Sequence, residues 1–217
     1  KHLTDPREFA TRWPLPSSSV DDVHFNPEAE WKGRRHVCPW NGRVWPMTNS
    51  HVIDGLIRQW HRRGAADGAI PVSPRARAGV LAGHLLDRFV KLMFHNGELA
   101  RPNCFEHYNP FTGRACEYRG IDDYQHSWVN DLIIRGLCGL EPVAHDGWSA
   151  GMCVASPKAG VLVDPLPMAV ERFEIHDVPV RGRLVSVRRD GAKFTVTVDG
   201  ASAGESVIGR GVFVPLA

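Results

Sequence analysis

Several features that mark whole classes of protein are missing from this sequence of 217 residues. No apolar run approaches the roughly 20 residues that a membrane-spanning helix needs. The formal net charge is only +2, so no strong field of one sign points to nucleic acid or a membrane surface as a partner. Hydrophobic residues make up 43% of the chain and charged residues 23%, as is typical of a globular protein that buries a core.

Cysteine is scarce and its spacing is irregular. The five cysteines are an odd number and form no C-x-x-C pair, which argues against a zinc site and a disulfide framework. His36 and Cys38 supply two potential ligands only, fewer than a protein metal site uses. We therefore expect no metal site and mostly buried free thiols, which favours a cytoplasmic location. The cysteines are Cys38, Cys104, Cys116, Cys138 and Cys153.

The chain begins with Lys1, and no apolar leader follows. Either a leader has been removed or the sequence is the C-terminal part of a longer protein. The small number of predicted helices favours the second interpretation.

Three stretches have helical periodicity, and a long loop rich in Pro, Trp and Ser precedes them at residues 1–46. Thr48 or Asn49 can cap the first helix. Ser73 caps the second, which starts with Pro74, a residue suited to the first helical position. The predicted helices are residues 48–63, 74–95 and 123–138.

From residue 148 on, short runs of apolar and polar residues alternate with period two. Asp190-Gly191 and Asp199-Gly200 between such runs are typical of tight hairpin turns. We predict a small antiparallel β domain at residues 148–217 after a helical part at residues 1–147, hence an α+β fold class. The β domain would cover the helical part or act as a carbohydrate-binding module. The predicted strands are residues 161–163, 173–175, 184–187, 194–198 and 212–214.

The chemistry is concentrated in residues 103–128. A single carboxylate, Glu106, stands among aromatic, histidine and asparagine side chains, and turns follow at Asn109-Pro110 and Thr112-Gly113. Aromatic rings stack on sugar faces, amides bind hydroxyl groups and an acid can transfer a proton. The stretch therefore favours sugar chemistry, with a solvated loop acid as the alternative.

Three motifs follow one another along the chain. Leu15-Pro16 to Asp21-Asp22 precedes the first, which runs Trp-Asn-Gly-Arg-Val-Trp-Pro from Trp40 to Pro46. The second runs Glu-His-Tyr-Asn-Pro-Phe-Thr-Gly from Glu106 to Gly113, and the third is His126-Ser127-Trp128.

In order and spacing these motifs resemble glycoside hydrolase family 63, above all its bacterial α-glucosidase and mannosylglycerate- or glucosylglycerate-hydrolase-like members. These are relatives of the trehalase-type (α/α)6-toroid enzymes. The family usually has Trp-Arg-Gly-Pro-(Val/Ile)-Trp-Pro, Glu-x-Tyr-(Asn/Asp)-Pro-x-Thr-Gly and Phe-Ser-Trp in these places. The resemblance covers residues 1–140, with departures at Asn41, Arg43 and His126 that bear on sugar specificity.

The resemblance implies the C-terminal portion of an (α/α)6 toroid followed by an antiparallel β-sandwich. It implies inverting hydrolysis of an α-glycosidic bond in a small sugar or glycoside, with Glu106 as the general base. The resemblance also implies a general acid, an aspartate much earlier in the chain, which would lie on preceding sequence. Asp122 and Asp123 are the candidates within this sequence, but they stand at a predicted helix N-terminus, which favours the ionised form and not a proton donor. The expected partners are a carbohydrate substrate and the remainder of the toroid. No cofactor, nucleic acid or membrane is expected.

Further side chains are predicted to bind the substrate. Trp40 and Trp45 would form an apolar platform under the sugar or pack in the core. Asn49 would bond a hydroxyl group or cap its helix, and Trp128 would face a pocket or the core. The predicted substrate-binding residues are Trp40, Asn41, Arg43, Trp45, Asn49, His107, Tyr108, Tyr124, His126 and Trp128.

Two other functions stay open at this point. The same toroid could carry a phosphorylase or lyase, for which Arg43 would be the phosphate ligand. Without an acid on preceding sequence, the chain would be a non-catalytic sugar-binding or structural subunit.

Overall fold

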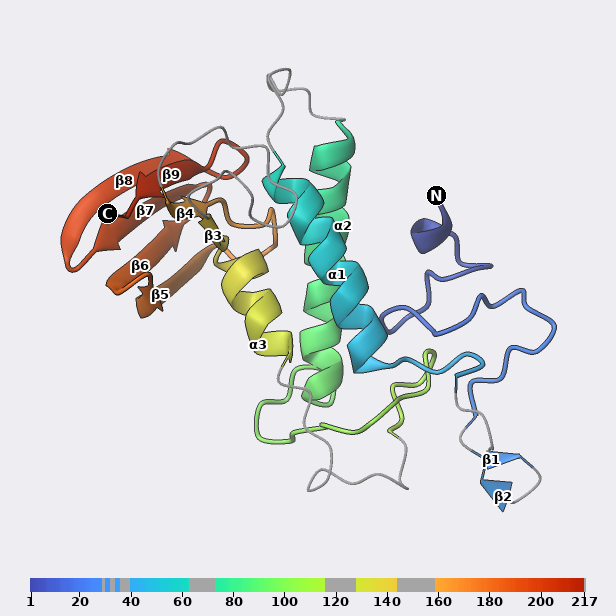
Figure 1. The fold of residues 1–217 in the computed structure, drawn as a ribbon. Helices are drawn as coiled ribbons and strands as arrows, with labels where there is room; N and C mark the ends of the chain where they lie inside the picture. The colour runs from blue at the N-terminus through green and yellow to red at the C-terminus, as the bar shows by residue number, and fades with distance from the viewer. Residues whose placement is uncertain are drawn as a thin grey trace. The chain divides into compact units, whose positions relative to one another are not determined.

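The computed structural model describes residues 1–28, 30–31, 34–35, 40–62, 73–115, 128–143 and 159–216. These residues form helices and antiparallel sheets, so the fold class is α+β (Figure 1). The helical elements are a 3-10 turn at His2–Thr4, α1 at Pro46–His61, α2 at Pro74–Met93, α3 at Trp128–Leu132 and a π-helical turn at Ile133–Leu137. The strands are β1 Glu30–Trp31, β2 Arg34–Arg35, β3 Leu140–Val143, β4 Gly160–Val163, β5 Arg172–Val180, β6 Arg183–Asp190, β7 Lys193–Val198, β8 Ala201–Val207 and β9 Val212–Pro215.

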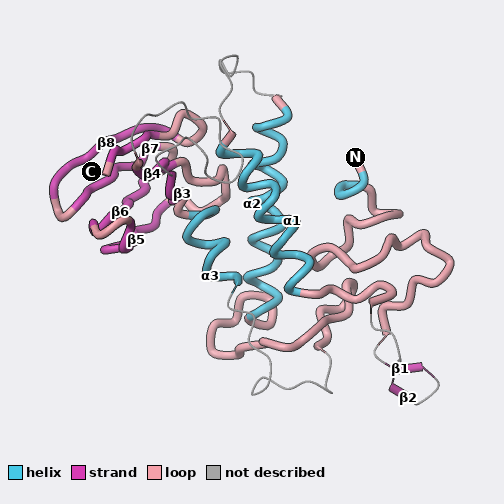
Figure 2. Tube along the Cα trace, in the orientation of Figure 1, coloured by secondary structure: helices cyan, strands magenta, loops and turns pink. Residues whose placement is uncertain are grey.

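Two compact units make up the chain, and their boundaries fall within α1 and α2. The first unit consists of Lys1–Ile53 and Leu85–Asn130, and the second of Asp54–His84 and Asp131–Ala217. Outside its helices, the first unit is mostly loop (pink in Figure 2). The predicted division between residues 147 and 148 stays a prediction.

Helices α1 and α2 confirm two of the predicted stretches. The Ser73 hydroxyl accepts a hydrogen bond from the Ala76 N–H at 3.1 Å, so Ser73 is the N-cap of α2 as predicted. The predicted caps of α1 are wrong, because Pro46 occupies its first position and the helix begins one turn before Asn49. Of the third predicted helix, residues 123–127 lie outside the described residues.

The second unit contains two antiparallel sheets. Strands β5, β6, β7 and β8 form a meander, and β3, β4 and β9 form a three-stranded sheet in that order. Asp199 and Gly200 have φ values of 49° and 80°, as a primed hairpin turn requires, which confirms the predicted turn between β7 and β8. Residues of both sheets share one buried apolar cluster, including Val161, Val187 and Phe194.

Four of the described strands were not predicted, the two-residue strands β1 and β2 and the longer strands β3 and β8. Strand β3 contains Pro142, which a sheet tolerates only at an edge, and β3 is an edge strand paired with β4 alone. Strand β8 reads Ala-Ser-Ala-Gly-Glu-Ser-Val, whose small residues have low β propensity, and its pairing with β7 holds it in place. Strand β3 thus lies before residue 148, where the predicted β domain starts.

Charged side chains join helical residues to β3 and the segment after β4 within the second unit. Arg135 bonds Asp54 on α1 and donates to Glu141 on β3 at 2.9 and 2.7 Å. Arg75 on α2 donates to Asp164 at 2.7 Å, and Asp164 is fully buried. No helix in the described part of the chain is long and apolar enough to cross a membrane.

Candidate active site

Two of the three sequence motifs lie side by side in the first unit. Val44 and Tyr108 exchange two backbone hydrogen bonds, of 2.8 and 2.9 Å, and form an antiparallel bridge. A second bridge joins Pro16 to Val44 on the other side. Val44 of the tryptophan segment therefore lies between the Leu15-Pro16 segment and the Glu106 loop and is bridged to both.

Stacked rings lead from Trp40 to the Glu106 loop. Trp40 and Trp45 stack with ring centroids 3.7 Å apart and planes within 2°, and the His107 ring lies 4.8 Å from the Trp45 centroid. Trp40 is 41% exposed, whereas Trp45 is only 5% exposed. Trp45 is thus a core residue in this arrangement, and Trp40 is the ring that presents an open face.

Arg43 fixes the position of His107. Its side chain is 2% exposed, and its Nε donates to Nδ1 of His107 at 2.6 Å. The two terminal nitrogens donate to the backbone carbonyls of Pro27 and Arg114. Because Nδ1 accepts a hydrogen bond, a neutral His107 carries its proton on Nε2. The guanidinium is buried among protein acceptors, and contact of Arg43 with a substrate or phosphate stays a prediction.

The buried side chain of Tyr108 holds the backbone that leads into the Glu106 loop. It is fully buried, and its hydroxyl donates to the Asn103 carbonyl and accepts from the Phe105 N–H at 2.7 Å. Burial raises the pKa of Tyr108, so the hydroxyl stays protonated. No part of the Tyr108 side chain reaches the surface of this structure, and its direct contact with substrate stays a prediction.

The Asn49 side chain also joins backbone segments of the first unit. Its amide oxygen accepts from the Leu15 N–H at 2.8 Å, and its amide nitrogen donates to the carbonyls of Leu15 and Trp45, each at 2.9 Å. The side chain is 1% exposed. The predicted cap is not found, because the amide pairs with the backbone of the Leu15 segment. The predicted contact with a substrate hydroxyl group stays a prediction.

Glu106 lies at a bend in the backbone and is half-buried. Asn41 is half-buried as well, and Trp128, the first residue of α3, is 41% exposed. Tyr124 and His126 lie outside the described residues. Glu106 is next in sequence to His107, whose ring lies against Trp45.

Two phenylalanines were missed as candidates. Phe25 and Phe111 meet edge to face with centroids 6.0 Å apart, and Phe111 is 42% exposed. Gly42 lies against Phe25, since a Cβ at Gly42 would come within 2.7 Å of the Phe25 ring. Phe111 occupies the variable position of the Asn-Pro-x-Thr-Gly motif. Its place in the same motif as Glu106 could have identified it as a candidate from the sequence.

Comparison with known families bears on this arrangement of motifs. The sequence model of the mannosylglycerate hydrolase MGH1-like glycoside hydrolase domain matches residues 1–127, more than half of the chain. The chain belongs to this family. The match confirms the resemblance to mannosylglycerate-hydrolase-related glycoside hydrolases, and it includes Trp40, Glu106 and the loops that join them. No curated protein and no solved structure matches the chain.

Membership in the MGH1-like family makes the chain part of a glycoside hydrolase, a protein of carbohydrate metabolism. Within the described residues no group of three or more His, Cys, Asp or Glu side chains is arranged to hold a metal ion. Side-chain contacts within and between the motifs join Trp40, Trp45, His107 and Arg43, and Glu106 is next in sequence to His107. Aromatic and polar groups of this kind are those that sugar recognition uses.

Proposed function

We propose that this chain belongs to an inverting α-glycosidase in which Glu106 is the general base. Family membership and the antiparallel contact between the Glu106 loop and the Trp40–Pro46 segment support the proposal. The helices would be the last part of an (α/α)6 toroid, and the two sheets would form the sandwich that follows it. The general acid would come from the remainder of the toroid.

The proposed chemistry needs two carboxyl groups about 6.5–9.5 Å apart, with a water molecule between the base and the anomeric carbon. Glu106, ionised, would take a proton from that water as it attacks the face opposite the leaving group. The acid would protonate the glycosidic oxygen. The exposed face of Trp40 would stack on a sugar ring, with Phe111 as a further apolar contact.

The loop around Glu106 is well suited to holding a base in one orientation. The Tyr108 hydroxyl holds the residue before Glu106, and backbone pairing with Val44 and the Arg43–His107 hydrogen bond hold the residues after it. A base held by such supports does not have to be ordered in the transition state. The proposed substrate is a small α-linked sugar or glycoside, in keeping with the mannosylglycerate named in the family description.

Phosphorolysis is the weaker alternative, because its phosphate would need a cation and Arg43 is buried among protein acceptors. Phosphate consumption during turnover would favour it over hydrolysis.

The test is Glu106→Gln in the complete enzyme. We expect turnover of an α-glycoside to fall by about 10²–10⁴-fold, the usual contribution of a general base, with folding unchanged. Azide, which needs no deprotonation to attack, should restore part of the rate in the variant. Nuclear magnetic resonance of the first product should show the inverted anomer.

A matched control is Glu205→Gln, the same change at an exposed position of β8, which should leave turnover unchanged. Near-normal turnover in Glu106→Gln, or a retained anomer as first product, would reject the proposal.

A further inference from the structure

The dipeptide Asn-Gly occurs twice in this sequence, at Asn41-Gly42 and at Asn96-Gly97. Asparagine followed by glycine is chemically labile, because the glycine nitrogen can attack the carbon of the asparagine side-chain amide. Glycine has no Cβ, so its nitrogen is open to approach and its backbone is free to turn. In a folded protein the reaction therefore depends on how firmly the peptide group between the two residues is held.

The peptide group that joins Asn41 to Gly42 is hydrogen-bonded on both sides. Its carbonyl accepts from the Asn26 N–H at 2.5 Å, and its N–H donates to the Ser17 hydroxyl at 3.1 Å. Gly42 is also buried, and a Cβ on it would come within 2.7 Å of the Phe25 ring. The backbone at this site cannot turn toward the Asn41 side chain without breaking both hydrogen bonds.

The peptide group that joins Asn96 to Gly97 is held weakly. Its N–H donates to the Lys91 carbonyl at 3.3 Å, which is longer than the usual range of about 2.7–3.2 Å. The same Lys91 carbonyl accepts the Asn96 N–H at 2.7 Å, so it is shared. The Asn96 carbonyl accepts no hydrogen bond from the residues that the structure describes. The Gly97 nitrogen is thus available for attack.

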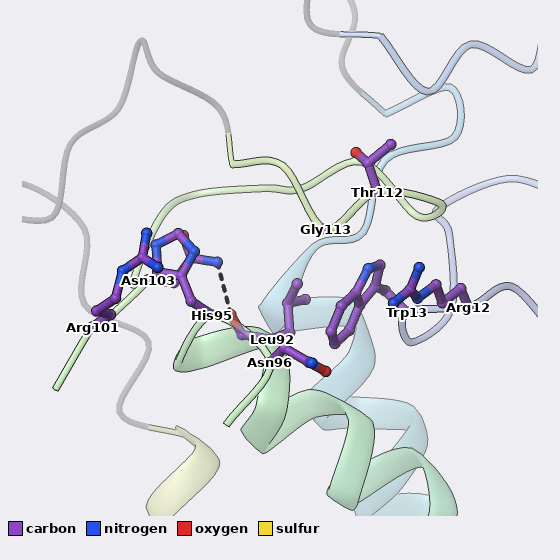
Figure 3. Close-up of a pocket in the computed structure, with 9 residues that line it drawn as sticks. All are labelled: Arg12, Trp13, Leu92, His95, Asn96, Arg101, Asn103, Thr112 and Gly113. Carbon is purple, nitrogen blue, oxygen red and sulfur yellow. Dashed lines mark hydrogen bonds between the residues drawn. The ribbon is translucent and has the colours of Figure 1, made fainter. Parts of the chain in front are cut away.

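The side chain of Asn96 is open to water. It is exposed, and it forms no hydrogen bond with any described residue. It lies in the turn that follows α2, beside a hollow of about 250 Å³ (Figure 3). The amide therefore has room to rotate toward the backbone, and water can reach it for hydrolysis.

We propose that Asn96 is a site of spontaneous deamidation and that the fold protects Asn41 from the same reaction. The Gly97 nitrogen loses its proton to water and forms a bond to Cγ of Asn96. The bond between Cγ and Nδ2 breaks, and Nδ2 takes up a proton and leaves as ammonia, so that a five-membered succinimide remains. Water then opens the ring at either of its two carbonyl groups, which gives aspartate or isoaspartate. No oxidant, reductant or cofactor takes part.

Either product changes the turn after α2. A carboxylate replaces a neutral amide near the negative end of the helix dipole, and isoaspartate also adds a methylene group to the backbone. Because the turn is exposed, the α-carboxylate of an isoaspartate there is accessible to a carboxyl methyltransferase. The reaction involves none of the residues proposed for glycoside hydrolysis, so it does not depend on that proposal.

The test is incubation of the folded protein at mildly alkaline pH, followed by proteolysis and mass spectrometry of the two Asn-Gly peptides. We expect Asn96 to convert at least about tenfold faster than Asn41, because Asn41 must first lose two backbone hydrogen bonds. Methyl transfer from S-adenosylmethionine by an isoaspartate carboxyl methyltransferase identifies the isoaspartate product. In concentrated urea the two rates should become similar, since neither peptide group is then held by the fold.

Substitution of the Ser17 hydroxyl supplies the second arm. Ser17→Ala removes the acceptor of the Gly42 N–H and should speed conversion at Asn41 by about threefold or more, with the rate at Asn96 unchanged. The matched control is Ser19→Ala, the same change in the same loop, where the hydroxyl donates to the Asp21 carboxylate at 2.5 Å. It should change neither rate, and circular dichroism checks that both variants fold.

Three results would each overturn the proposal. They are an absence of conversion at Asn96, conversion at Asn41 as fast as at Asn96 in the folded protein, and equal effects of Ser17→Ala and Ser19→Ala on the rate at Asn41.

Discussion

Arg43 is a buried cation whose three nitrogens join separate parts of the first unit. It bonds a ring nitrogen of His107 and the carbonyls of Pro27 and Arg114. A guanidinium can serve three acceptors because its donors lie in one plane and point outward in a fixed fork. The same acceptors offset the desolvation of a charge that is 2% exposed. Arg43 therefore acts on the Glu106 loop through His107.

Arg43→Lys keeps the positive charge but loses the planar, forked arrangement of hydrogen-bond donors. We expect it to lower the free energy of unfolding by about 2–3 kcal/mol, because an ammonium cannot reach all three acceptors. Urea denaturation measures this, and turnover should fall as His107 and the adjacent Glu106 lose their fixed position. Arg172→Lys, at a position that is 81% exposed, should change stability by less than about 0.5 kcal/mol. Equal losses in the two variants would contradict the role given to Arg43.

The junction between the π-helical turn and β3 depends on a glycine. Gly139 has a φ of 73°, and a Cβ on it would lie 2.3 Å from the carbonyl carbon of Asp164 and from the nitrogen of Pro165. The Asp164 N–H donates to the Gly139 carbonyl at 3.0 Å. The two backbone segments thus approach more closely than any side chain permits. Gly182, between β5 and β6, has a similar φ of 76° but open space around it.

Comparing Gly139→Ala with Gly182→Ala separates two costs of placing alanine at a glycine with positive φ. One is the strain of the left-handed backbone conformation, and the other is steric overlap with neighbouring backbone atoms. Gly182→Ala should lower the free energy of unfolding by about 1 kcal/mol, the cost of a left-handed conformation for alanine. Gly139→Ala should cost about 2–4 kcal/mol, because a steric overlap with backbone atoms is added to the same strain. Thermal unfolding measured by circular dichroism gives both values. Similar losses would show that the close approach at Gly139 is relaxed at little cost.

At the scale of the whole molecule, pH acts through the buried charges of the second unit. Glu141 is 5% exposed; burial by itself raises its pKa, but His61 at 3.7 Å and the two hydrogen bonds from Arg135 outweigh that effect. The pKa of Glu141 therefore lies below its ordinary value of 4.5. A carboxyl group with a lowered folded pKa stabilises the fold above its unfolded pKa, and this contribution is lost as pH falls through the folded pKa.

We therefore expect the free energy of unfolding to decrease as the pH is lowered below about 4.5. Urea titrations at a series of pH values measure the slope, and Glu141→Gln should reduce it. Asp199 is a comparison: its pKa is also lowered, by the Leu184 N–H and by Arg183, but it lies on an exposed hairpin where solvent screens the charge. Asp199→Asn should change the slope less. An unchanged slope in Glu141→Gln would show that the network does not couple to folding.

Part of the candidate site could be predicted from the sequence, because its motifs are contiguous. The Glu106 loop and the Trp40–Pro46 segment are short runs whose residues stay neighbours however the chain folds. The roles of Arg43, Asn49 and Tyr108 could not be predicted in this way. Their partners include His107 and Leu15, 64 and 34 positions away along the chain, so polar groups suited to a sugar became supports instead.

The sequence by itself determined the family, helices α1 and α2 and the tight hairpin at Asp199-Gly200, because these depend on local order, periodicity and backbone freedom. Only the tertiary structure decided the strand at Pro142, the low-propensity strand β8 and the exposure of Trp40 over the buried Trp45. The physical reason is that contacts with distant segments decide such features. They position a strand whose own residues have low β propensity, and they position a polar side chain whose hydrogen-bond partner is far along the chain.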